Sequence, residues 1–305
     1  MGLALKLLLI VLLIASCSRT LLVAQGSRSV QEHNRSGLDR QNRGDIDGAI
    51  EDFTNAITAS KGVMLVVSLS NRANARMIKN DWSGAIADYT RTIELQLGKD
   101  SAAGQKDDSK SGSVVIAPPI EMAYLNRGIA RHAVGEFDGA ISDYNRALAA
   151  LPNLAEAYYN RGIAYQSKGD SQAAIRDYSA ALELAPQLGD AYVNRGQVRH
   201  SLQDLEGAIA DYNVALQIKP DDAGIFYARA TAHQQKKNLN AALNDYSKVV
   251  QLDPKNAQAF ANRAVIETLL GKHTEARQDF EQAFKLDPGL KDQYKQFIEG
   301  RLNKP

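Results

Sequence analysis

The sequence predicts an all-α fold, an α-solenoid built from a repeated pair of helices. Two observations predict it: the chain repeats itself every 34 residues, and each repeat contains two apolar patterns with helical spacing. A period in this range is the signature of stacked helical or mixed repeats. Five blocks align without a gap, from Glu121, Ala155, Gly189, Ala223 and Ala257, and two more align from Val30 and Val66.

Each block reads as two helices joined by a short turn. In the block from Ala155, Tyr158, Gly162 and Tyr165 follow an i, i+4, i+7 spacing. The same spacing recurs in the second half of the block, after a break at Lys168 to Asp170. One such pair cannot bury its apolar face alone, so neighbouring pairs are expected to stack.

Residues of fixed size mark the places where helices must approach. Counting from the first residue of each block, position 8 is always small: Gly37, Ala73, Gly128, Gly162, Gly196, Ala230 and Ala264. Position 20 is always alanine: Ala49, Ala85, Ala140, Ala174, Ala208, Ala242 and Ala276. Position 24 is always aromatic: Phe53, Tyr89, Tyr144, Tyr178, Tyr212, Tyr246 and Phe280.

With proline at position 32 of five blocks, this pattern resembles the tetratricopeptide repeat (TPR) family over residues 30–290. The resemblance implies a right-handed α-solenoid whose concave surface binds protein partners, with seven repeats. The first two blocks depart from the family pattern, since Lys61 and Leu97 replace the proline and His33 and Leu69 replace the aromatic residue at position 4. We expect repeats 1 and 2 over residues 30–99 and repeats 3 to 7 over residues 121–290.

The amino terminus has the pattern of an export signal. An apolar run, Leu7 to Ala15, follows a short segment with one lysine and is too short to span a bilayer. The run ends in Ile-Ala-Ser-Cys, which resembles a bacterial lipobox and implies cleavage before Cys17 and lipidation of that cysteine. Residues 1–16 are then the signal peptide and 17–29 a flexible tether. Cleavage after Ala24, giving a soluble exported protein, and an uncleaved anchor are the alternatives.

Two segments lie outside the repeat pattern. Residues 100–120 are rich in Gly, Ser, Lys and Asp, which favours a mobile insertion that splits the array into two repeats and five. This insertion is a tolerated surface loop or a regulatory, partner-binding one. Residues 291–305 place Tyr294, Phe297 and Ile298 at helical spacing, which predicts a helix that caps the open end of the array.

Asparagine recurs at position 6, about 160° to 220° around the first helix from the apolar stripe. Side chains there are expected to point away from the partner helix, toward a concave groove. An amide both donates and accepts hydrogen bonds, so a row of them can bind the backbone of an extended peptide. The row resembles the asparagine ladder of O-linked N-acetylglucosamine transferase and comprises Asn71, Asn126, Asn160, Asn194 and Asn262. The alternative is simple solvation of an exposed face.

Positions 5 and 9 are also turned toward the expected groove. Apolar residues there suit peptide recognition. They are Leu125, Ile129, Tyr159, Ile163, Val193 and Tyr227. Position 5 lacks the basic residue that a chaperone-binding TPR domain needs for its carboxylate clamp, so a co-chaperone role is disfavoured.

Arginine recurs on the first helix and aspartate on the second, each at the same angular offset from the apolar stripe of its own helix. Position 7 is Arg72, Arg127, Arg161, Arg195, Arg229 and Arg263. Position 23 is Asp52, Asp88, Asp143, Asp177, Asp211, Asp245 and Asp279. Equal offsets in an antiparallel helix pair predict a repeated ion pair, within a repeat or shared with the next. Two independent solvated charges are the alternative.

The sequence contains no recognisable catalytic or phosphate-binding motif, and no cofactor or metal ion is expected. The five histidines are scattered, and the single cysteine rules out a cysteine-based zinc site. The net charge of +1, evenly spread, does not favour nucleic acid.

We therefore expect a non-catalytic scaffold that binds an extended or helical segment of a protein partner. The lipobox, followed by Ser18 rather than aspartate, favours an outer-membrane lipoprotein facing the periplasm, anchored through its lipid and serving as an adaptor for an assembly or cell-wall complex. The alternative location is a soluble periplasmic or secreted form. A substrate-recognition arm, or an enzyme with an unrecognised active site, is the alternative function.

Overall fold

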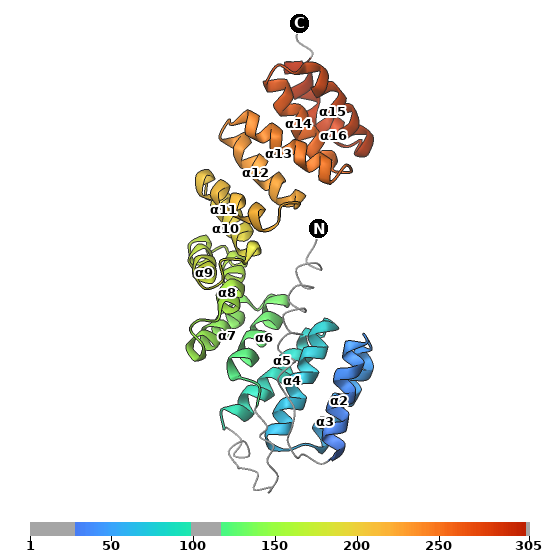
Figure 1. The fold of residues 1–305 in the computed structure, drawn as a ribbon, viewed down its shortest axis with the longest axis vertical. Coiled ribbons are helices and arrows are strands. Elements are labelled where there is room, and N and C mark those ends of the chain that lie inside the picture. The colour runs from blue at the N-terminus through green and yellow to red at the C-terminus, as the bar shows by residue number, and fades with distance from the viewer. Residues whose placement is uncertain (1–27, 99–116, 303–305) are drawn as a thin grey trace. The chain divides into compact units, whose positions relative to one another are not determined.

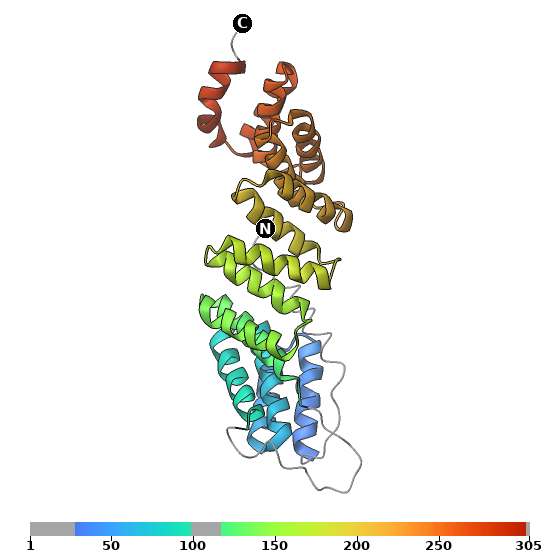
Figure 2. The same cartoon turned by 90° about the vertical axis from the view of Figure 1, so that its left-hand side faces the viewer.

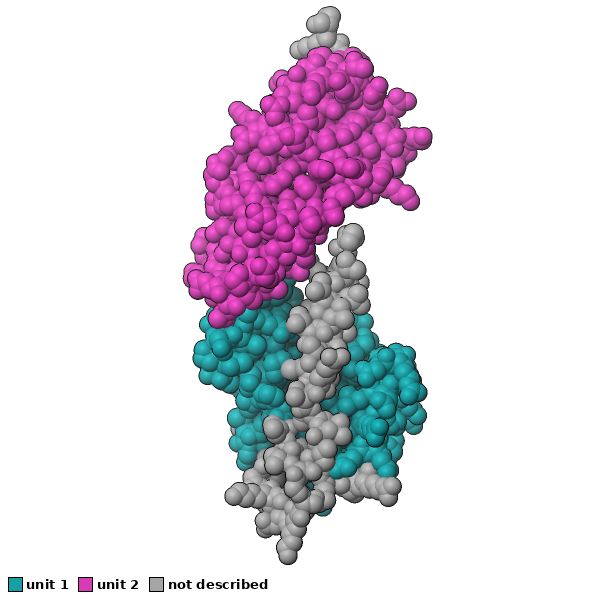
Figure 3. Space-filling view, viewed as in Figure 1, with its two compact units in different colours: residues 1–164 teal, residues 165–305 magenta. Residues whose placement is uncertain are grey.

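The computed structural model describes residues 28–98 and 117–302, and these residues are helical throughout apart from short turns (Figure 1). The predicted signal peptide, Cys17, nearly all of the tether and most of the predicted insertion lie outside the described residues. The chain divides into two compact units, residues 1–164 and 165–305, coloured separately in Figure 3. Each unit is described by itself.

The described part of the first unit contains repeats 1 to 3 and the first helix of repeat 4. Its helices are α2 (Arg28–Asn42), α3 (Ile46–Ala59), α4 (Gly62–Ile78), α5 (Trp82–Gln96), α6 (Ile120–Ala133), α7 (Phe137–Ala150) and α8 (Ala155–Ser167). Helices α2 and α3, α4 and α5, and α6 and α7 pack as pairs. The last three residues of α8 belong to the second unit.

The second unit continues with the second helix of repeat 4 and repeats 5 to 7. Its helices are α9 (Ser171–Leu184), α10 (Gly189–Ser201), α11 (Leu205–Ile218), α12 (Ala223–Gln235), α13 (Leu239–Leu252), α14 (Ala257–Leu269), α15 (His273–Leu286) and α16 (Leu290–Phe297). A π-helical turn, Ile298–Leu302, follows α16 directly. The turned view in Figure 2 shows the successive antiparallel helices. None of the helices that the structure describes is long and apolar enough to cross a membrane.

The turn between the two helices of every repeat has one residue in the left-handed conformation. This residue is always at position 15, as in Gly135 with φ 82° and Gly271 with φ 79°. Three repeats use another residue, Asn80, Gln203 or Lys237, with φ between 61° and 65°. Four of the second helices then begin with an aspartate cap, and Asp204, for example, accepts the backbone N–H of Gly207 at 2.9 Å. The left-handed residue at position 15 and the cap that follows it therefore define where the first helix ends and the second begins.

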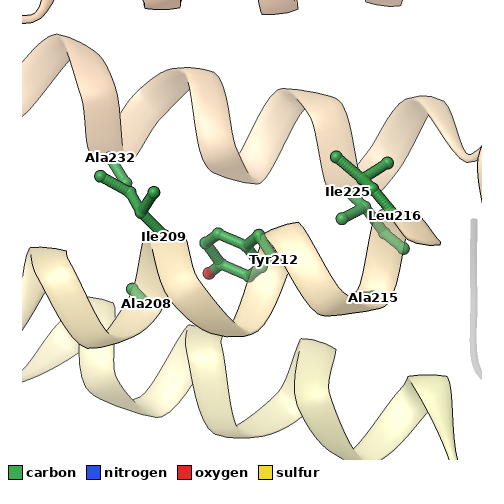
Figure 4. Packing of buried hydrophobic residues seen from close by; sticks show 7 residues of the cluster. All are labelled: Ala208, Ile209, Tyr212, Ala215, Leu216, Ile225 and Ala232. Atoms are coloured by element: carbon green, nitrogen blue, oxygen red, sulfur yellow. The ribbon is translucent and has the colours of Figure 1, made fainter. Parts of the chain in front are cut away.

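The core consists of similar clusters repeated along the chain. In repeat 5, Tyr212 and Ala208 of α11 are nearly inaccessible to solvent, and Ile225 and Ala232 of α12 close the cluster from the next repeat (Figure 4). Small residues at positions 8 and 20 allow this approach. At Gly196, an added Cβ would lie 2.7 Å from Cε1 of Tyr212, and at Gly128 it would lie 2.6 Å from Cε1 of Tyr144. The aromatic ring at position 24 therefore requires a very small residue opposite.

The predicted insertion separates repeats 2 and 3 in chain order, and the two repeats nevertheless pack together; its last four residues, 117–120, are packed and not part of a mobile segment. Helices α5 and α6 pack directly against each other. Ala117 packs against the cluster of Val66, Leu69 and Leu95 in repeat 2, and Gln96 donates a hydrogen bond to the carbonyl of Pro118. Residues 117–120 therefore belong to the packed structure, because their apolar side chains and backbone complete the interface between repeats 2 and 3.

The two ends of the described array are finished differently. At the first repeat, α2 presents polar side chains around a shallow depression of about 290 Å³, lined by Glu32, Arg35, Ser36, Asp39, Arg40 and Arg43. Position 10, which is Asp39 here, is a buried alanine, valine or isoleucine in every later repeat. At the other end, Leu290 and Leu302 are buried on repeat 7, and Phe297 and Ile298 pack beside them. This is the place predicted for the capping helix.

Candidate functional site

The position 7 arginine and the position 23 aspartate meet within each repeat where both lie in one unit. In repeat 3, Arg127 Nε and Nη2 donate to the two carboxylate oxygens of Asp143 at 2.9 and 2.7 Å. Asp143 is 1% exposed, so the pair is buried. The same two-pronged arrangement forms in repeats 2, 5, 6 and 7: Arg72 with Asp88, Arg195 with Asp211, Arg229 with Asp245, and Arg263 with Asp279.

The remaining predicted pair, Arg161 and Asp177, spans the division between the two units and stays a prediction. Within the first unit, the Arg161 guanidinium donates to the side-chain oxygen of Asn145 and lies over the ring of Tyr158. Repeat 1 has no arginine at position 7. There, the Ser36 hydroxyl donates to Asp52 at 2.6 Å, and Arg40 lies 3.3 Å from the same carboxylate.

The same arginine also joins each repeat to the one before it. Arg127 Nη1 donates to the hydroxyl of Thr90 at 3.0 Å, and Arg195 Nη1 donates to Ser179 at 2.8 Å. The acceptor is always the residue at position 25 of the preceding repeat, a serine, threonine or asparagine. Position 7 was not predicted to have this role, although a polar residue recurs at position 25 in the sequence. The ion pair is thus within a repeat, and the third guanidinium nitrogen connects the stack.

A second arginine, at position 11, was also missed. Arg131 Nη1 donates to Asp143 at 2.7 Å, and Arg76 and Arg199 do the same to Asp88 and Asp211. In these repeats one buried carboxylate neutralises part of two guanidinium charges. The spacing is a signal in the sequence, because position 11 lies one helical turn beyond position 7. Repeats 6 and 7 have His233 and Glu267 at this position.

The predicted asparagine row is largely buried. Asn126, Asn160 and Asn194 are 8%, 6% and 4% exposed, whereas Asn71 and Asn262 are half-buried. The expectation of open amides on a solvated face therefore does not describe the first three. Their amides have partners inside the protein: Asn160 donates to the backbone carbonyl of Glu156 at 2.8 Å, one turn earlier.

Two of these asparagines lie against the phenol of the preceding repeat. Asn262 Nδ2 lies 3.4 Å from the hydroxyl of Tyr246, and Asn126 hydrogen-bonds the hydroxyl of Tyr89. A buried phenol needs a polar partner, because an unmade hydrogen bond costs free energy. Burial raises the pKa of Tyr89 and Tyr246 well above the usual range, so both stay neutral. The asparagine at position 6 thus stabilises the contact between repeats. The angle of this residue on its own helix does not show that contact.

The predicted apolar groove residues differ in exposure. Leu125 and Ile129 are buried, with 0% and 5% of their surface exposed. Tyr159 and Ile163 of α8 and Val193 and Tyr227 of the second unit are half-buried. The residues that can meet a ligand without rearrangement are therefore the latter four.

In the second unit, the first helices of successive repeats form one surface. We call the first helix of each repeat its A helix. The A-helix face of the second unit then consists of residues of α10, α12 and α14, namely Val193, Asn194, Gln197, Tyr227, Asn262 and Val265. Helices α10 and α12 are direct neighbours. Asn262 Nδ2 donates to the hydroxyl of Tyr227 at 2.9 Å, which fixes the aromatic side chain on this face.

Hydrogen bonds continue from this face to the end of the array. The Tyr294 hydroxyl of α16 donates to Asn262 Oδ1 at 2.9 Å, and Gln258 also donates to Asn262 Oδ1. Burial raises the pKa of both Tyr227 and Tyr294, so neither phenol bears a charge near neutral pH. The face therefore offers a fixed aromatic ring and amides, without an ionised group at its centre.

Two of the histidines, His132 and His233, are partly buried within their repeats. His132 lies 5.2 Å from the ring of Phe137, and burial lowers its pKa. Burial also lowers the pKa of His233, which therefore favours the neutral form. Within residues 28–98 and 117–302, no group of three or more His, Cys, Asp or Glu side chains is placed to hold a metal ion.

Comparison with known proteins agrees with this architecture. Three family models, each described as a tetratricopeptide repeat or TPR repeat, match residues 155–188, residues 128–169 and 196–237, and residues 227–290. A search of curated proteins finds no significant match.

Solved structures of several repeat proteins resemble the chain. One is YrrB, described as a TPR protein with an unusual peptide-binding site, which is 24% identical, with 55% of this chain and 87% of YrrB covered and a TM-score of 0.52. A TPR protein from Parabacteroides merdae is 19% identical, with coverage of 86% and 94% and a TM-score of 0.59. A MamA fragment from Desulfovibrio magneticus is 21% identical, with coverage of 55% and 96% and a TM-score of 0.52. At such low identity these likenesses show the fold alone. Together with the three family models, the repeated helix pairs identify this chain as a member of the tetratricopeptide repeat family.

Proposed function

We propose that the A-helix face of the second unit binds an extended or helical peptide segment of a protein partner. Proteins built from these repeats are typically non-catalytic interaction scaffolds. The observation that supports this face is Tyr227, a half-buried aromatic side chain whose hydroxyl is fixed by Asn262. An aromatic ring held in place contributes contact area at a small cost in conformational entropy, as at many protein interfaces.

The chemistry of the face indicates the kind of segment. Positions 5, 6 and 9 of repeats 5 to 7 are all uncharged. Of the two acidic side chains nearest to them in the sequence, Asp190 is paired with Lys219 at 2.8 Å and Glu267 is buried. An apolar side chain can pack against Val193 and Tyr227 while the exposed amide of Gln197 meets the peptide backbone. We therefore expect an uncharged segment and an affinity that depends little on ionic strength.

YrrB is described as having an unusual peptide-binding site, and this likeness supports peptide recognition as a use of the fold. Because the identity is 24%, the likeness supports no residue of the site. The binding residues named for this chain come from its own structure.

The test is selection from a library of random 12-residue peptides on the full chain, followed by titration of the enriched peptides. Tyr227→Ala should weaken binding at least tenfold, and Tyr227→Phe, which keeps the ring, should weaken it less. Leu252→Ser is the matched control, because Leu252 is an exposed apolar residue on α13 of the same repeat. Equal affinities for the parent and Tyr227→Ala, at an unchanged melting temperature, would rule out this face.

We further propose that the protein is an envelope adaptor, exported and anchored by a lipid on Cys17. The lipobox-like sequence Ile14-Ala15-Ser16-Cys17 supports this location. Mass spectrometry of the mature protein should find Cys17 at the amino terminus with attached acyl chains. Cys17→Ser should release the protein from the membrane fraction. A mature amino terminus at Gln25 would instead indicate the soluble exported form.

Crosslinking in intact cells, followed by mass spectrometry, would identify the partner. Crosslinks from the A-helix face to one envelope protein are expected to disappear in Tyr227→Ala and to persist in Leu252→Ser. Capture of the same partner by both variants would place the interaction elsewhere on the protein.

A further inference from the structure

Repeat 7 has a carboxylate where four other repeats have an arginine. Position 11 is Arg40, Arg76, Arg131 and Arg199 in repeats 1, 2, 3 and 5, and in each of these the guanidinium approaches the position 23 aspartate. In repeat 7 the residue is Glu267, beside Asp279 and Arg263. Two carboxylates therefore share one arginine, whereas in repeats 2, 3 and 5 two arginines share one carboxylate.

The contacts show that this arginine is committed to Asp279. Arg263 donates from Nε and Nη2 to both oxygens of Asp279, while its Nε lies 4.0 Å from Glu267 Oε1. The other oxygen, Glu267 Oε2, is buried and has no hydrogen-bond partner. Glu267 as a whole is 7% exposed. An ionised carboxylate in this place is poorly compensated, because it has lost water and gained only a distant cation.

The charges around Glu267 come from α14, α15 and the turn between them. Asp279 and Glu275 of α15 oppose ionisation, whereas Arg263 of α14 and Lys272 of the turn favour it. On the α13 side, the Ser247 hydroxyl lies 3.5 Å from Arg263. Burial, followed by the charge of Asp279, raises the pKa of Glu267 to about 7. The side chain therefore changes charge within the range of mildly acidic to mildly alkaline conditions.

Helix α14 also holds the end of the array. Its Asn262 accepts the hydrogen bond of Tyr294 from α16, and the Tyr294 ring lies 5.5 Å from the ring of Phe280 on α15. Any loosening between α14 and α15 therefore also frees the capping segment, residues 290–302.

We infer that Glu267 makes repeat 7 and its capping segment sensitive to pH, with the end of the array packed firmly in mildly acidic conditions and opening more readily above neutrality. The direction follows from the charge: protonated Glu267 is neutral beside Asp279, and ionised Glu267 adds a second buried negative charge. Repeat 3 lacks this response because its position 11 residue is Arg131. The inference concerns local opening and holds whether or not a peptide binds the A-helix face.

Hydrogen exchange of the full chain, read by mass spectrometry, tests this inference. Opening constants of amides in residues 257–302 are compared at pH 5.5 and 7.5 after correction for the intrinsic exchange rate. One proton whose pKa moves from 4.5 to about 7 on folding predicts a roughly twentyfold rise in the opening constant over this range. Amides of repeat 5, where position 11 is Arg199 beside Asp211, are the internal reference and should show no such rise.

Glu267→Gln should abolish the rise, because the amide resembles the protonated acid and cannot ionise. The matched control is Glu281→Gln, the same change at an exposed residue of α15, which should leave the rise intact. A second variant, Glu267→Arg, restores the pattern of repeat 3 and should also abolish it. A parent protein without the rise, or a rise that survives in both Glu267 variants, would overturn the inference.

Discussion

Repeats 3 and 7 have the same helix pair and the same two-pronged arginine–aspartate contact, yet they differ in three other places. Repeat 3 adds Arg131 to the Asp143 pair, whereas repeat 7 adds Glu267 to the Asp279 pair. Repeat 3 has glycine at position 8, opposite Tyr144, and repeat 7 has Ala264 opposite Phe280. The arginine of repeat 3 reaches the preceding repeat at 3.0 Å, and that of repeat 7 at 3.5 Å.

The repeat pattern thus defines the two helices and their arginine–aspartate pair, whereas residues at single positions decide how stable each repeat is. Asp143 is almost inaccessible and accepts hydrogen bonds from two guanidinium groups. Asp279 has one such partner and a second carboxylate nearby. Repeat 3 should therefore resist local opening more than repeat 7. Four sets of substitutions test this comparison.

The largest effect is expected for Asp143→Asn. Removal of this carboxylate leaves Arg127 and Arg131 buried or half-buried without their counter-ion, which should cost about 3 to 5 kcal/mol of unfolding free energy. Asp279→Asn should cost less, about 1 kcal/mol, because Glu267 remains as a carboxylate for Arg263. Denaturant unfolding followed by circular dichroism measures both. Equal losses of unfolding free energy would show that the residue at position 11, Arg131 or Glu267, has no influence on the pair.

Arg131→Glu transfers the pattern of repeat 7 to repeat 3. The loss of one cation and the burial of a second carboxylate beside Asp143 should cost about 2 to 4 kcal/mol at pH 8. The introduced carboxyl should have a raised pKa in the folded state, as Glu267 does. The destabilisation by this carboxyl is therefore absent below its pKa in the unfolded chain, and it grows as the pH rises through its pKa in the folded protein. Melting temperatures at pH 5 and pH 8 check the sign, and a smaller destabilisation at pH 8 would contradict it.

Gly128→Ala tests the difference at position 8. The new Cβ would lie 2.6 Å from Tyr144, which should cost about 1 to 3 kcal/mol before the small gain in helix propensity. Gly224→Ala is the control, because its Cβ would meet only the side-chain oxygen of Asp222 within 4 Å, at 3.1 Å. Thermal unfolding compares them. A destabilisation at Gly224 as large as that at Gly128 would remove steric crowding as the explanation.

The smallest effect is expected for the link between repeats. Thr90→Val removes the acceptor of Arg127 Nη1 and should cost about 1 kcal/mol. Ser247→Ala, at the longer contact with Arg263, should cost less than about 0.5 kcal/mol. Hydrogen exchange of α5 and α6 reports the first change directly. Unchanged protection there in Thr90→Val would show that this bond does not help to join repeats 2 and 3.

The residue pattern was sufficient for much of the fold. The period of 34 predicted the helix pairs, and the capping segment lies where Tyr294, Phe297 and Ile298 predicted it. It also predicted that Arg127 faces Asp143, because equal offsets on antiparallel helices bring two side chains together. Its end bound for the insertion was wrong, since residues 117–120 pack at the interface between α5 and α6, which composition does not show.

The candidate site was predicted less well, for a physical reason. Helical position states which way a side chain points from its own helix, but the neighbouring repeat decides what it meets. Asn194 and Asn126 occupy the predicted angle and are nevertheless buried, and Asn126 meets Tyr89 of the preceding repeat. Leu125 is buried too, whereas Tyr227, at the same position three repeats later, is half-buried.

The residue pattern was enough to predict the all-α class, the seven helix pairs and the arginine–aspartate pairs, because these depend on contacts within 34 residues that recur along the chain. Only the packed structure shows which arginine nitrogen reaches the preceding repeat, which amides are buried and which carboxylate lacks a counter-ion. These properties depend on the distance between repeats, and that distance is defined only when the aromatic and small residues of neighbouring helices pack together.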